Sequence, residues 1–374
     1  MTEEMQVDAT PGRQSPMWPR RVIGRGDHVR ELPPHERSLE ALTFEGGAGA
    51  RTDIADFMAR RGTAGLLVLK NGEIALERYG AGGGPERRRH GYSTAKSLTS
   101  TLAGAALHDG AIGSLDDRCD HYLPRLIGSA YEGVTLRNVL RMCSGVAWEE
   151  ENVPEERSDL WRLNAALEHR QAGAVLDLAC ALPRVHPQGE VFNYSTVESC
   201  LLGAVVVAAT GRPLADYCAE KVWGPAGMEA DALWALESED GLEMGGLGVS
   251  ARLRDLGRFG LLMLADGVAF DGQRVLPAGW RDLAGRPDCG ATGFGRLWPG
   301  NAGGYGYQWW VVPPGSINHG AFSARGAYGQ FIVIHPGEQV VIVIQSAWPG
   351  SHDPEAEAET VMLIRAAVAA LRGA

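Results

Sequence analysis

Three features that often reveal a partner are absent from this sequence of 374 residues. No stretch reaches the roughly 18 apolar residues that a membrane-spanning helix needs. The formal net charge is −11, whereas a nucleic-acid backbone is held by clustered Lys and Arg. Residues 1–21 carry acidic side chains where a signal peptide has basic ones, and they lack an apolar core. We therefore expect a cytoplasmic protein that binds neither a membrane nor nucleic acid.

The cysteines lack the spacing of a metal site. The sequence has no C-x-x-C pair and no histidine at a zinc-binding distance from a cysteine. We therefore expect no metal, and free, mostly buried thiols. The six positions are Cys119, Cys143, Cys180, Cys200, Cys218 and Cys289.

Several common catalytic motifs are also missing. The sequence has no G-x-S-x-G nucleophile elbow, no G-x-x-x-x-G-K-[ST] phosphate loop and no H-E-x-x-H zinc motif. It also lacks a G-x-G-x-x-G that opens a helix after a strand. These absences argue against the usual hydrolase, nucleotide-binding, zinc-protease and dinucleotide-binding signatures.

Strand-like segments lie at both ends of the chain, with helical ones between them. Asn71-Gly72 separates two apolar runs and predicts a hairpin, and β-branched runs return beyond about residue 304. The pattern predicts an α/β fold with one domain split in sequence, a mainly helical domain and the active site between the two. The predicted parts are a tail or arm at 1–36, an α/β domain at 37–115 and 286–374, and the helical domain at 116–285.

Lysine is rare, which draws attention to Ser93-Thr94-Ala95-Lys96. Lysine occurs only at positions 70, 96 and 221, while arginine supplies the other 32 of the 35 basic residues. Residues three apart on a helix share one face, and a desolvated lysine, unlike arginine, can take a proton from a hydroxyl. The motif predicts a nucleophile and its base. Accidental spacing is the alternative, since such a motif arises by chance roughly one time in seven in a chain of this composition.

Two later segments add candidates. The phenol of Tyr194 could relay a proton to a leaving group, and the alternative is a half-buried aromatic at the end of a strand. Residues 319–330 are rich in small residues, so substrate could lie against the strand edge and a backbone N–H could complete an oxyanion hole. An ordinary glycine-rich hairpin is the alternative there.

Together these segments resemble the serine β-lactamase and penicillin-binding superfamily, in that family's order and over about residues 60–370. The resemblance is greatest to its class C-like branch of esterases and 6-aminohexanoate-dimer hydrolases. It implies a β-lactamase/transpeptidase-like fold, with an antiparallel sheet flanked by helices and an added helical domain. The stretches that carry it are GYSTAKSLTSTLAGAALHDGAIGSLDD, VTLRNVLRMCSGV, QGEVFNYSTVESCLLGAVVVAATGRPL, GGLGVSARLRDLGRFGLLML and ARGAYGQFIVIHP.

The resemblance also implies residue roles. Ser93 would be acylated, Lys96 would remove its proton, and Tyr194 would be the general acid and base. The backbone N–H groups of Ser93 and Ala324 would form the oxyanion hole, and water would release the acyl group. No metal or organic cofactor is implied.

Two departures from the family pattern bear on the substrate. Ala-Phe-Ser at 321–323 replaces the family's Lys-Thr-Gly or His-Thr-Gly, so we do not expect a dedicated β-lactamase. Beside Gly326, which would lie near the substrate, Arg325 or His319 is the candidate replacement for the cation, and a surface charge is the alternative.

The second departure lies in the loop after Trp148, which we expect to help line the substrate cleft. The 6-aminohexanoate-dimer hydrolases look like G-x-x-[WF]-D-E-D-Y-x-D-P here, and this chain has Asn152 in place of the tyrosine. An amide nitrogen leaves poorly unless it is protonated, so we expect ester hydrolysis to exceed amide hydrolysis. Asn152 as a solvated loop residue is the alternative.

We therefore expect a serine hydrolase that acts on a small-molecule ester or amide through a Ser93 acyl-enzyme. An acyltransferase on the same scaffold and a non-catalytic binding protein are the alternatives. The sequence makes no prediction of the oligomeric state.

Overall fold

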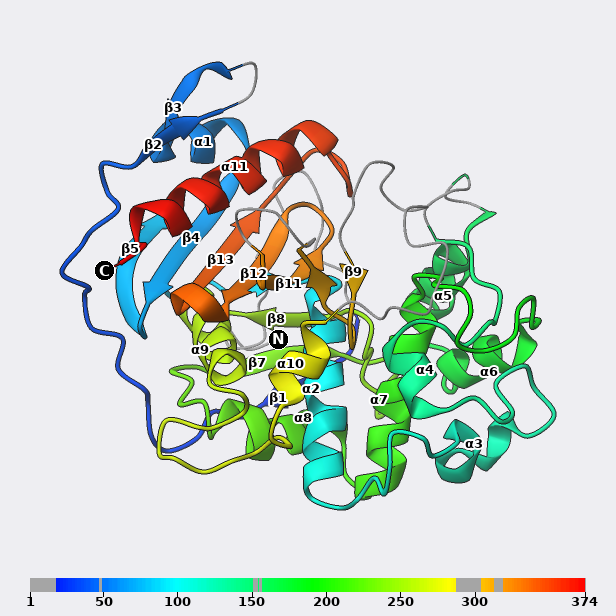
Figure 1. Ribbon diagram of the computed structural model, residues 1–374. Helices are drawn as coiled ribbons and strands as arrows, with labels where there is room; N and C mark the ends of the chain where they lie inside the picture. The colour runs from blue at the N-terminus through cyan, green and yellow to red at the C-terminus, as the bar shows by residue number, and fades with distance from the viewer. Residues whose placement is uncertain are drawn as a thin grey trace.

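Strands from opposite ends of the chain lie side by side in one large sheet. The computed structural model describes residues 18–46, 49–150, 154, 157–286, 304–312 and 319–373. Its seven-stranded antiparallel sheet has the order β5-β4-β13-β12-β11-β10-β9 (Figure 1). These strands are β4 (Thr63–Lys70), β5 (Glu73–Tyr79), β9 (Gly304–Tyr305), β10 (Trp310–Val311), β11 (Phe322–Gly326), β12 (Gln330–His335) and β13 (Val340–Ser346).

The predicted hairpin between β4 and β5 is confirmed. Asn71 and Gly72 both have positive φ, 53° and 86°, as a two-residue turn that matches the twist of its strands requires.

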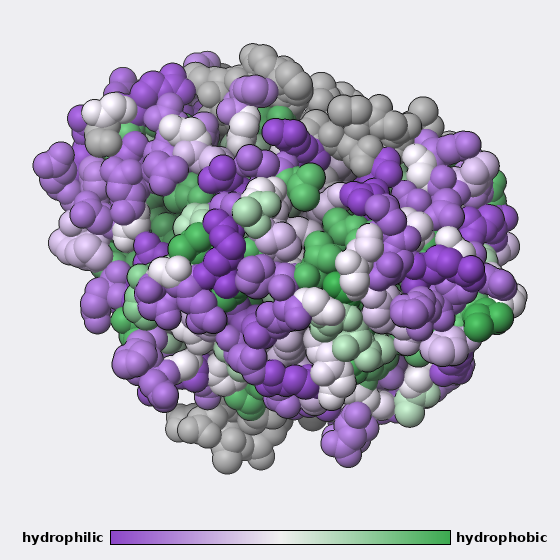
Figure 2. Space-filling model, turned by 60° about the horizontal axis from the view of Figure 1, so that its bottom comes forward, coloured by the Kyte–Doolittle hydropathy of each residue, from purple (hydrophilic) through white to green (hydrophobic). Residues whose placement is uncertain are grey.

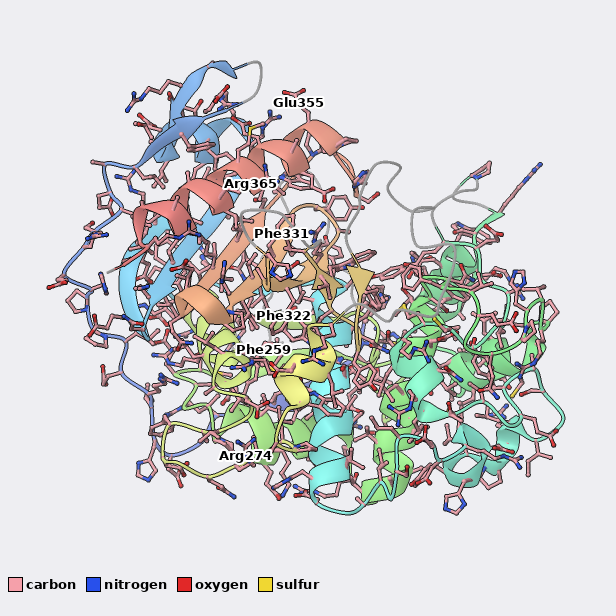
Figure 3. The ribbon with its side chains drawn as sticks, in the orientation of Figure 1. Phe259, Arg274, Phe322, Phe331, Glu355 and Arg365 are labelled. Atoms are coloured by element: carbon pink, nitrogen blue, oxygen red, sulfur yellow. The ribbon has the colours of Figure 1, made fainter. Side chains whose placement is uncertain are left out.

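Both faces of the large sheet are covered, so its central strands are apolar throughout. Along β13, Val341 and Val343 face the core cluster that includes α2 and α9, while Ile342 and Ile344 face the cluster that includes α1 and α11. This alternation explains why the strand reads as one continuous apolar run. In Figure 3, Phe322 and Phe259 lie on the α9 side of the sheet and Phe331 lies nearer α11.

The helices have the following bounds. They are α1 (Ile54–Arg60), α2 (Thr94–His108), α3 (Cys119–Tyr122), η3 (Pro124–Leu126), α4 (Leu136–Leu140), α5 (Asp159–Glu168), α6 (Ala174–Ala181), α7 (Thr196–Thr210), α8 (Leu214–Cys218), the π-helical turn η5 (Ala219–Trp223), α9 (Leu253–Leu264), α10 (Trp280–Ala284), η6 (Pro336–Glu338) and α11 (Pro354–Ala370).

Helix α2 forms the central support of the molecule. It packs against α7 on one side and contacts β11 on another, and its residues from Thr94 to Ala106 are all buried. Helices α3 to α6 gather on the far side of α7 in Figure 1. The start of α2 is therefore held between the helical region and the edge of the sheet.

A second sheet was not expected from the sequence. Its four strands have the order β1-β7-β8-β6, and a separate pair joins β2 to β3. The described part of the predicted arm thus contributes a strand, and Figure 1 shows the chain from β1 to β2 along the outer edge of the molecule. The bounds are β1 (Arg20–Ile23), β2 (Thr43–Glu45), β3 (Arg51–Asp53), β6 (Arg89–His90), β7 (Ala232–Ala235) and β8 (Val249–Ala251).

The predicted domain boundaries stay predictions. Helix α9 falls within the range 116–285, yet it packs against β4, β12 and β13 of the large sheet. Within the described residues, no single helix has the length and composition to cross a membrane. One bent pair, Thr196–Thr210 with Leu214–Trp223, meets both criteria, although most of its first helix is buried in the core.

The surface offers little continuous apolar area. The face shown in Figure 2 is mainly hydrophilic, with hydrophobic residues in small separate areas. Large exposed side chains such as Ile127, Val185 and Phe270 lie in three separate connecting segments, which is normal for a globular protein.

Candidate active site

Ser93 lies in a sharp turn between β6 and α2. The preceding residue, Tyr92, has a φ of 48°, a left-handed conformation that is uncommon for a bulky side chain. Ser93 is the N-cap residue of α2, but its hydroxyl makes no capping hydrogen bond. The hydroxyl is half-buried and is available for another partner.

That partner is Lys96, one helical turn further on. The distance from Lys96 Nζ to Ser93 Oγ is 2.9 Å, and Lys96 is only 1% exposed. The amine also donates to Thr196 Oγ1 and to the carbonyl oxygen of Gly246, both at 2.9 Å. All three oxygens are neutral, so the amine is held by hydrogen bonds rather than by an adjacent carboxylate in these contacts.

Tyr194 lies against the same amine. The centroid of its ring is 4.8 Å from Lys96 Nζ, at the distance of a cation–π contact. The ring packs 5.5 Å from Trp310 and 6.1 Å from Tyr305, within a buried aromatic cluster. The structure therefore brings Ser93, Lys96 and Tyr194 together from α2 and from the residues just before α7.

Two further residues complete this arrangement, and the sequence analysis missed both. Glu150 accepts hydrogen bonds from the Thr196 backbone N–H (3.0 Å), the Thr196 hydroxyl (2.8 Å) and the Trp148 indole N–H (2.7 Å). The sequence analysis did not single out Glu150. The single sequence signal was the position of Thr196 two residues after Tyr194, and nothing in the sequence linked it to a carboxylate 46 positions earlier.

Trp148 is buried beside Glu150. It is 3% exposed, and its indole N–H is used by Glu150. Its predicted substrate contact stays a prediction, and its indole N–H contacts the site through the carboxylate of Glu150. Asn152, the other predicted residue of this loop, lies outside the described residues.

The strand register contradicts the oxyanion role predicted for Ala324. Val312 N donates to Ala321 O at 3.0 Å, so odd-numbered residues of β11 bond toward β10 and even-numbered ones toward β12. Ala324, which pairs with Ile332, therefore turns its N–H into the β11–β12 ladder. The N–H of Arg325 points the other way, past the first residue of β10.

Gly326 lies at the closest approach between β11 and the turn before Ser93. A Cβ atom on Gly326 would lie 2.3 Å from the carbonyl oxygen of Gly91, so no side chain fits there. Gly326 thus sets the distance between strand and nucleophile, which is a different role from the predicted substrate contact.

The two candidate cations differ in their surroundings. Arg325 pairs with Glu357 of α11 at 2.7 Å, donates to Ser323 Oγ at 3.1 Å and lies 5.8 Å from the ring centroids of Trp310 and Phe331. His319 is exposed, just before β11. The structure therefore ties Arg325 into the fold, and its predicted substrate role stays untested, as does that of His319.

The described cysteines are all free, and four of the five are buried; Cys289 lies outside the described residues. Within that same part of the chain, no group of three or more His, Cys, Asp or Glu residues is placed to hold a metal ion.

Comparison with known proteins adds the following findings. A family model described as Beta-lactamase matches residues 50–367. The chain is 30% identical over 350 residues to the 6-aminohexanoate-dimer hydrolase of Paenarthrobacter ureafaciens, covering 92% of this chain and 85% of that protein.

Solved structures show the same fold. A Bacillus anthracis protein provisionally described as a 6-aminohexanoate-dimer hydrolase matches with a TM-score of 0.79 and 24% identity, over 93% of this chain and 90% of that one. A family VIII carboxylesterase matches with a TM-score of 0.62 and 19% identity, over 84% of this chain and 96% of that one. The predicted antiparallel sheet with flanking helices is thus confirmed.

Proposed function

Because the chain belongs to the beta-lactamase family, we propose that it is a serine hydrolase that cleaves a carboxylic ester or a small amide through an acyl-enzyme on Ser93. The observation that carries the proposal is the 2.9 Å contact between the Ser93 hydroxyl and the buried amine of Lys96. A buried lysine favours its neutral form, which is the form that accepts a proton from a hydroxyl.

The reaction begins when Lys96 takes the Ser93 proton as Oγ attacks the carbonyl carbon of the substrate. The carbonyl oxygen becomes negative in the tetrahedral intermediate, where backbone N–H groups stabilise it. The N–H of Ser93 is one donor. On the register of β11 the second is the N–H of Arg325, in place of that of Ala324.

The intermediate collapses by breaking the bond to the leaving group. Tyr194 gives its proton to the departing oxygen or nitrogen and takes one back from Lys96. Water then attacks the acyl group on Ser93, releases the acid and restores the serine hydroxyl. No step needs a metal or an organic cofactor.

The type of bond that is cleaved, ester or amide, is proposed from the relatives and from the loop after Trp148. The relative from Paenarthrobacter ureafaciens is named for an amide substrate, and the carboxylesterase for an ester. Since Asn152 replaces the tyrosine of the amide hydrolases, we propose that esters react faster than the matching amides. This preference is measured as the ratio of kcat/KM for an ester and an amide of the same acid.

The test is Ser93→Ala, with hydrolysis of a p-nitrophenyl ester as the readout. We expect kcat/KM to fall at least about 1,000-fold, because no other group replaces the nucleophile. Ser38→Ala is the matched control, since Ser38 is exposed and far from α2 in the sequence. Full turnover by Ser93→Ala would remove the proposal.

Two measurements on the wild type separate the remaining alternatives. Intact-mass detection of an acyl group on Ser93 distinguishes an enzyme from a non-catalytic binding protein. Product analysis with a competing alcohol or amine distinguishes a hydrolase from an acyltransferase.

A further inference from the structure

Glu150 is placed to control the direction in which the Lys96 amine faces. One carboxylate oxygen, Oε2, accepts from both the Trp148 indole N–H and the Thr196 backbone N–H. The other oxygen, Oε1, is 2.8 Å from Thr196 Oγ1. An ionised carboxylate can only accept hydrogen bonds, so each of these three contacts has a fixed direction.

The direction of the Thr196 hydroxyl bond follows from that. A threonine hydroxyl has one proton, and Glu150 takes it. In its contact with Lys96 Nζ at 2.9 Å, Thr196 Oγ1 must therefore be the acceptor.

The same argument applies to Lys96 in its neutral, reactive form. A neutral amine has two N–H bonds and one lone pair. The carbonyl oxygen of Gly246 can only accept, and Thr196 Oγ1 is made to accept, so these two contacts use both N–H bonds. The lone pair is then directed toward Ser93 Oγ, where it must lie in order to take the proton.

We propose that Glu150 is a positioning residue for the reaction, acting through Thr196 to orient the lone pair of Lys96 toward Ser93. The proposal rests on the proposed function, since it assigns a task only if Ser93 is the nucleophile. Once Lys96 carries the serine proton, the same carboxylate lies one hydroxyl away from the new ammonium and stabilises it. The role resembles that of the acid that orients the histidine in a serine-protease triad.

Two other titratable groups face the amine and bear on its protonation. The Tyr194 ring lies 4.8 Å from Nζ, and the Cys200 thiol of α7 lies in the field of Lys96. Burial raises the pKa of Cys200 to about 12, so this thiol is neutral at physiological pH. Glu150 is thus the negatively charged group that is connected to Lys96 through the hydroxyl of Thr196.

Glu150→Gln is the decisive variant. The glutamine carbonyl oxygen accepts the hydrogen bonds of the Trp148 indole N–H and the Thr196 backbone N–H, as Oε2 does in the wild type. The glutamine NH₂ then takes the place of Oε1 and donates to Thr196 Oγ1. The Thr196 proton is then released to point at the Lys96 lone pair, in competition with Ser93. We expect kcat to fall roughly 10- to 100-fold while KM changes by less than about 3-fold, because substrate binding is not altered.

The acid limb of the kcat/KM profile gives a readout that a general structural defect would not move. Removing the carboxylate makes protonation of the amine less favourable. Lys96 therefore stays neutral to lower pH, and the acid limb of the kcat/KM profile moves to lower pH in Glu150→Gln. Glu149→Gln is the matched control, since it is an exposed neighbour in the same loop and should leave both kcat and the acid limb unchanged.

Thr196 supplies a second, independent test. Thr196→Val removes the hydroxyl and should lower kcat as Glu150→Gln does, whereas Thr196→Ser keeps the hydroxyl and should recover most of that loss. The double variant Glu150→Gln with Thr196→Val should be no worse than either single one, because both break the same connection.

The outcomes separate this inference from the proposed function. If Ser93→Ala is inactive but Glu150→Gln keeps wild-type kcat and pH profile, the inference is overturned and the acyl-enzyme stands. If Ser93→Ala is fully active, both are lost. A fall in kcat that is additive in the double variant would also overturn the connection through Thr196.

Discussion

Two buried or half-buried cations lie near the site, and they are held in opposite ways. Lys96 donates to three neutral oxygens, and the hydroxyl of Thr196 connects it to Glu150. Arg325 pairs directly with Glu357 at 2.7 Å and is enclosed by two aromatic rings. A direct carboxylate partner holds a proton on its cation, so it suits a permanent charge and not a base. The difference agrees with the proton-transfer role proposed for Lys96, whereas the ion pair of Arg325 attaches β11 to α11.

The largest effect is expected from replacing Lys96 by an arginine, which is permanently charged as Arg325 is. Lys96→Arg keeps the positive charge but removes the ability to lose a proton, so kcat/KM should fall at least about 1,000-fold. Lys221→Arg is the control, since Lys221 forms surface ion pairs with Asp109 and Glu220 that arginine can keep. Ester hydrolysis by both variants measures the effect, and an active Lys96→Arg would contradict the comparison.

A third titratable group, Glu198 of α7, extends the comparison to an acid held by a hydroxyl. It accepts a hydrogen bond from Ser144, and its second oxygen has no hydrogen-bond partner among the described residues. Burial raises the pKa of this carboxyl to about 8. Folding therefore favours the protonated form, and this contribution to stability is lost as the pH rises from about 4.5 to 8.

Glu198→Gln should remove that dependence, because glutamine mimics the neutral acid. Over the range from pH 5 to pH 8 we expect the free energy of unfolding of the wild type to fall by about 2–4 kcal/mol more than that of the variant. Urea unfolding at several pH values measures the two slopes. Parallel slopes would show that Glu198 is ionised in the folded protein.

A smaller effect is expected from the ion pair of Arg325. Glu357→Gln leaves a guanidinium without its carboxylate in a site where both side chains are less than one-fifth exposed, which should cost about 1–3 kcal/mol of unfolding free energy. Glu355→Gln is the control on the same helix (Figure 3), since the pair of Glu355 with Arg61 is exposed on the Glu355 side. Its loss should cost about 0–1 kcal/mol. Equal losses in urea unfolding would mean that Arg325 is not held as described.

The sequence predicted the parts of the site that are close together along the chain. Ser93 and Lys96 are one helical turn apart, so their spacing alone places them in contact. The hairpin at Asn71-Gly72 follows from local backbone preference in the same way. Tyr194 was a candidate from its own segment, and the resemblance to a known family implied its acid–base role; no local pattern could have placed it beside the amine.

The parts that failed depend on distant pairing or on a one-residue register. Glu150 and Thr196 meet only because α7 packs beside the loop after Trp148. Ala324 and Arg325 differ by one position, yet successive residues of a strand bond in opposite directions. The resemblance to a family could not decide which of the two backbone N–H groups faces the site. The small sheet escaped notice because its strands are only two to four residues long.

The pairing of β4 with β13 has a consequence for biosynthesis. Ser93 and Lys96 follow β4 and β5 closely in the sequence, whereas β11 is joined to β4 in the sheet through β12 and β13. A growing polypeptide that has already made Ser93 and Lys96 therefore lacks a finished reaction centre until the last strands leave the ribosome. Under the proposed function, acyl transfer would have to wait until synthesis is nearly complete, and a chain cut short before Val340 would carry Ser93 and Lys96 without β13.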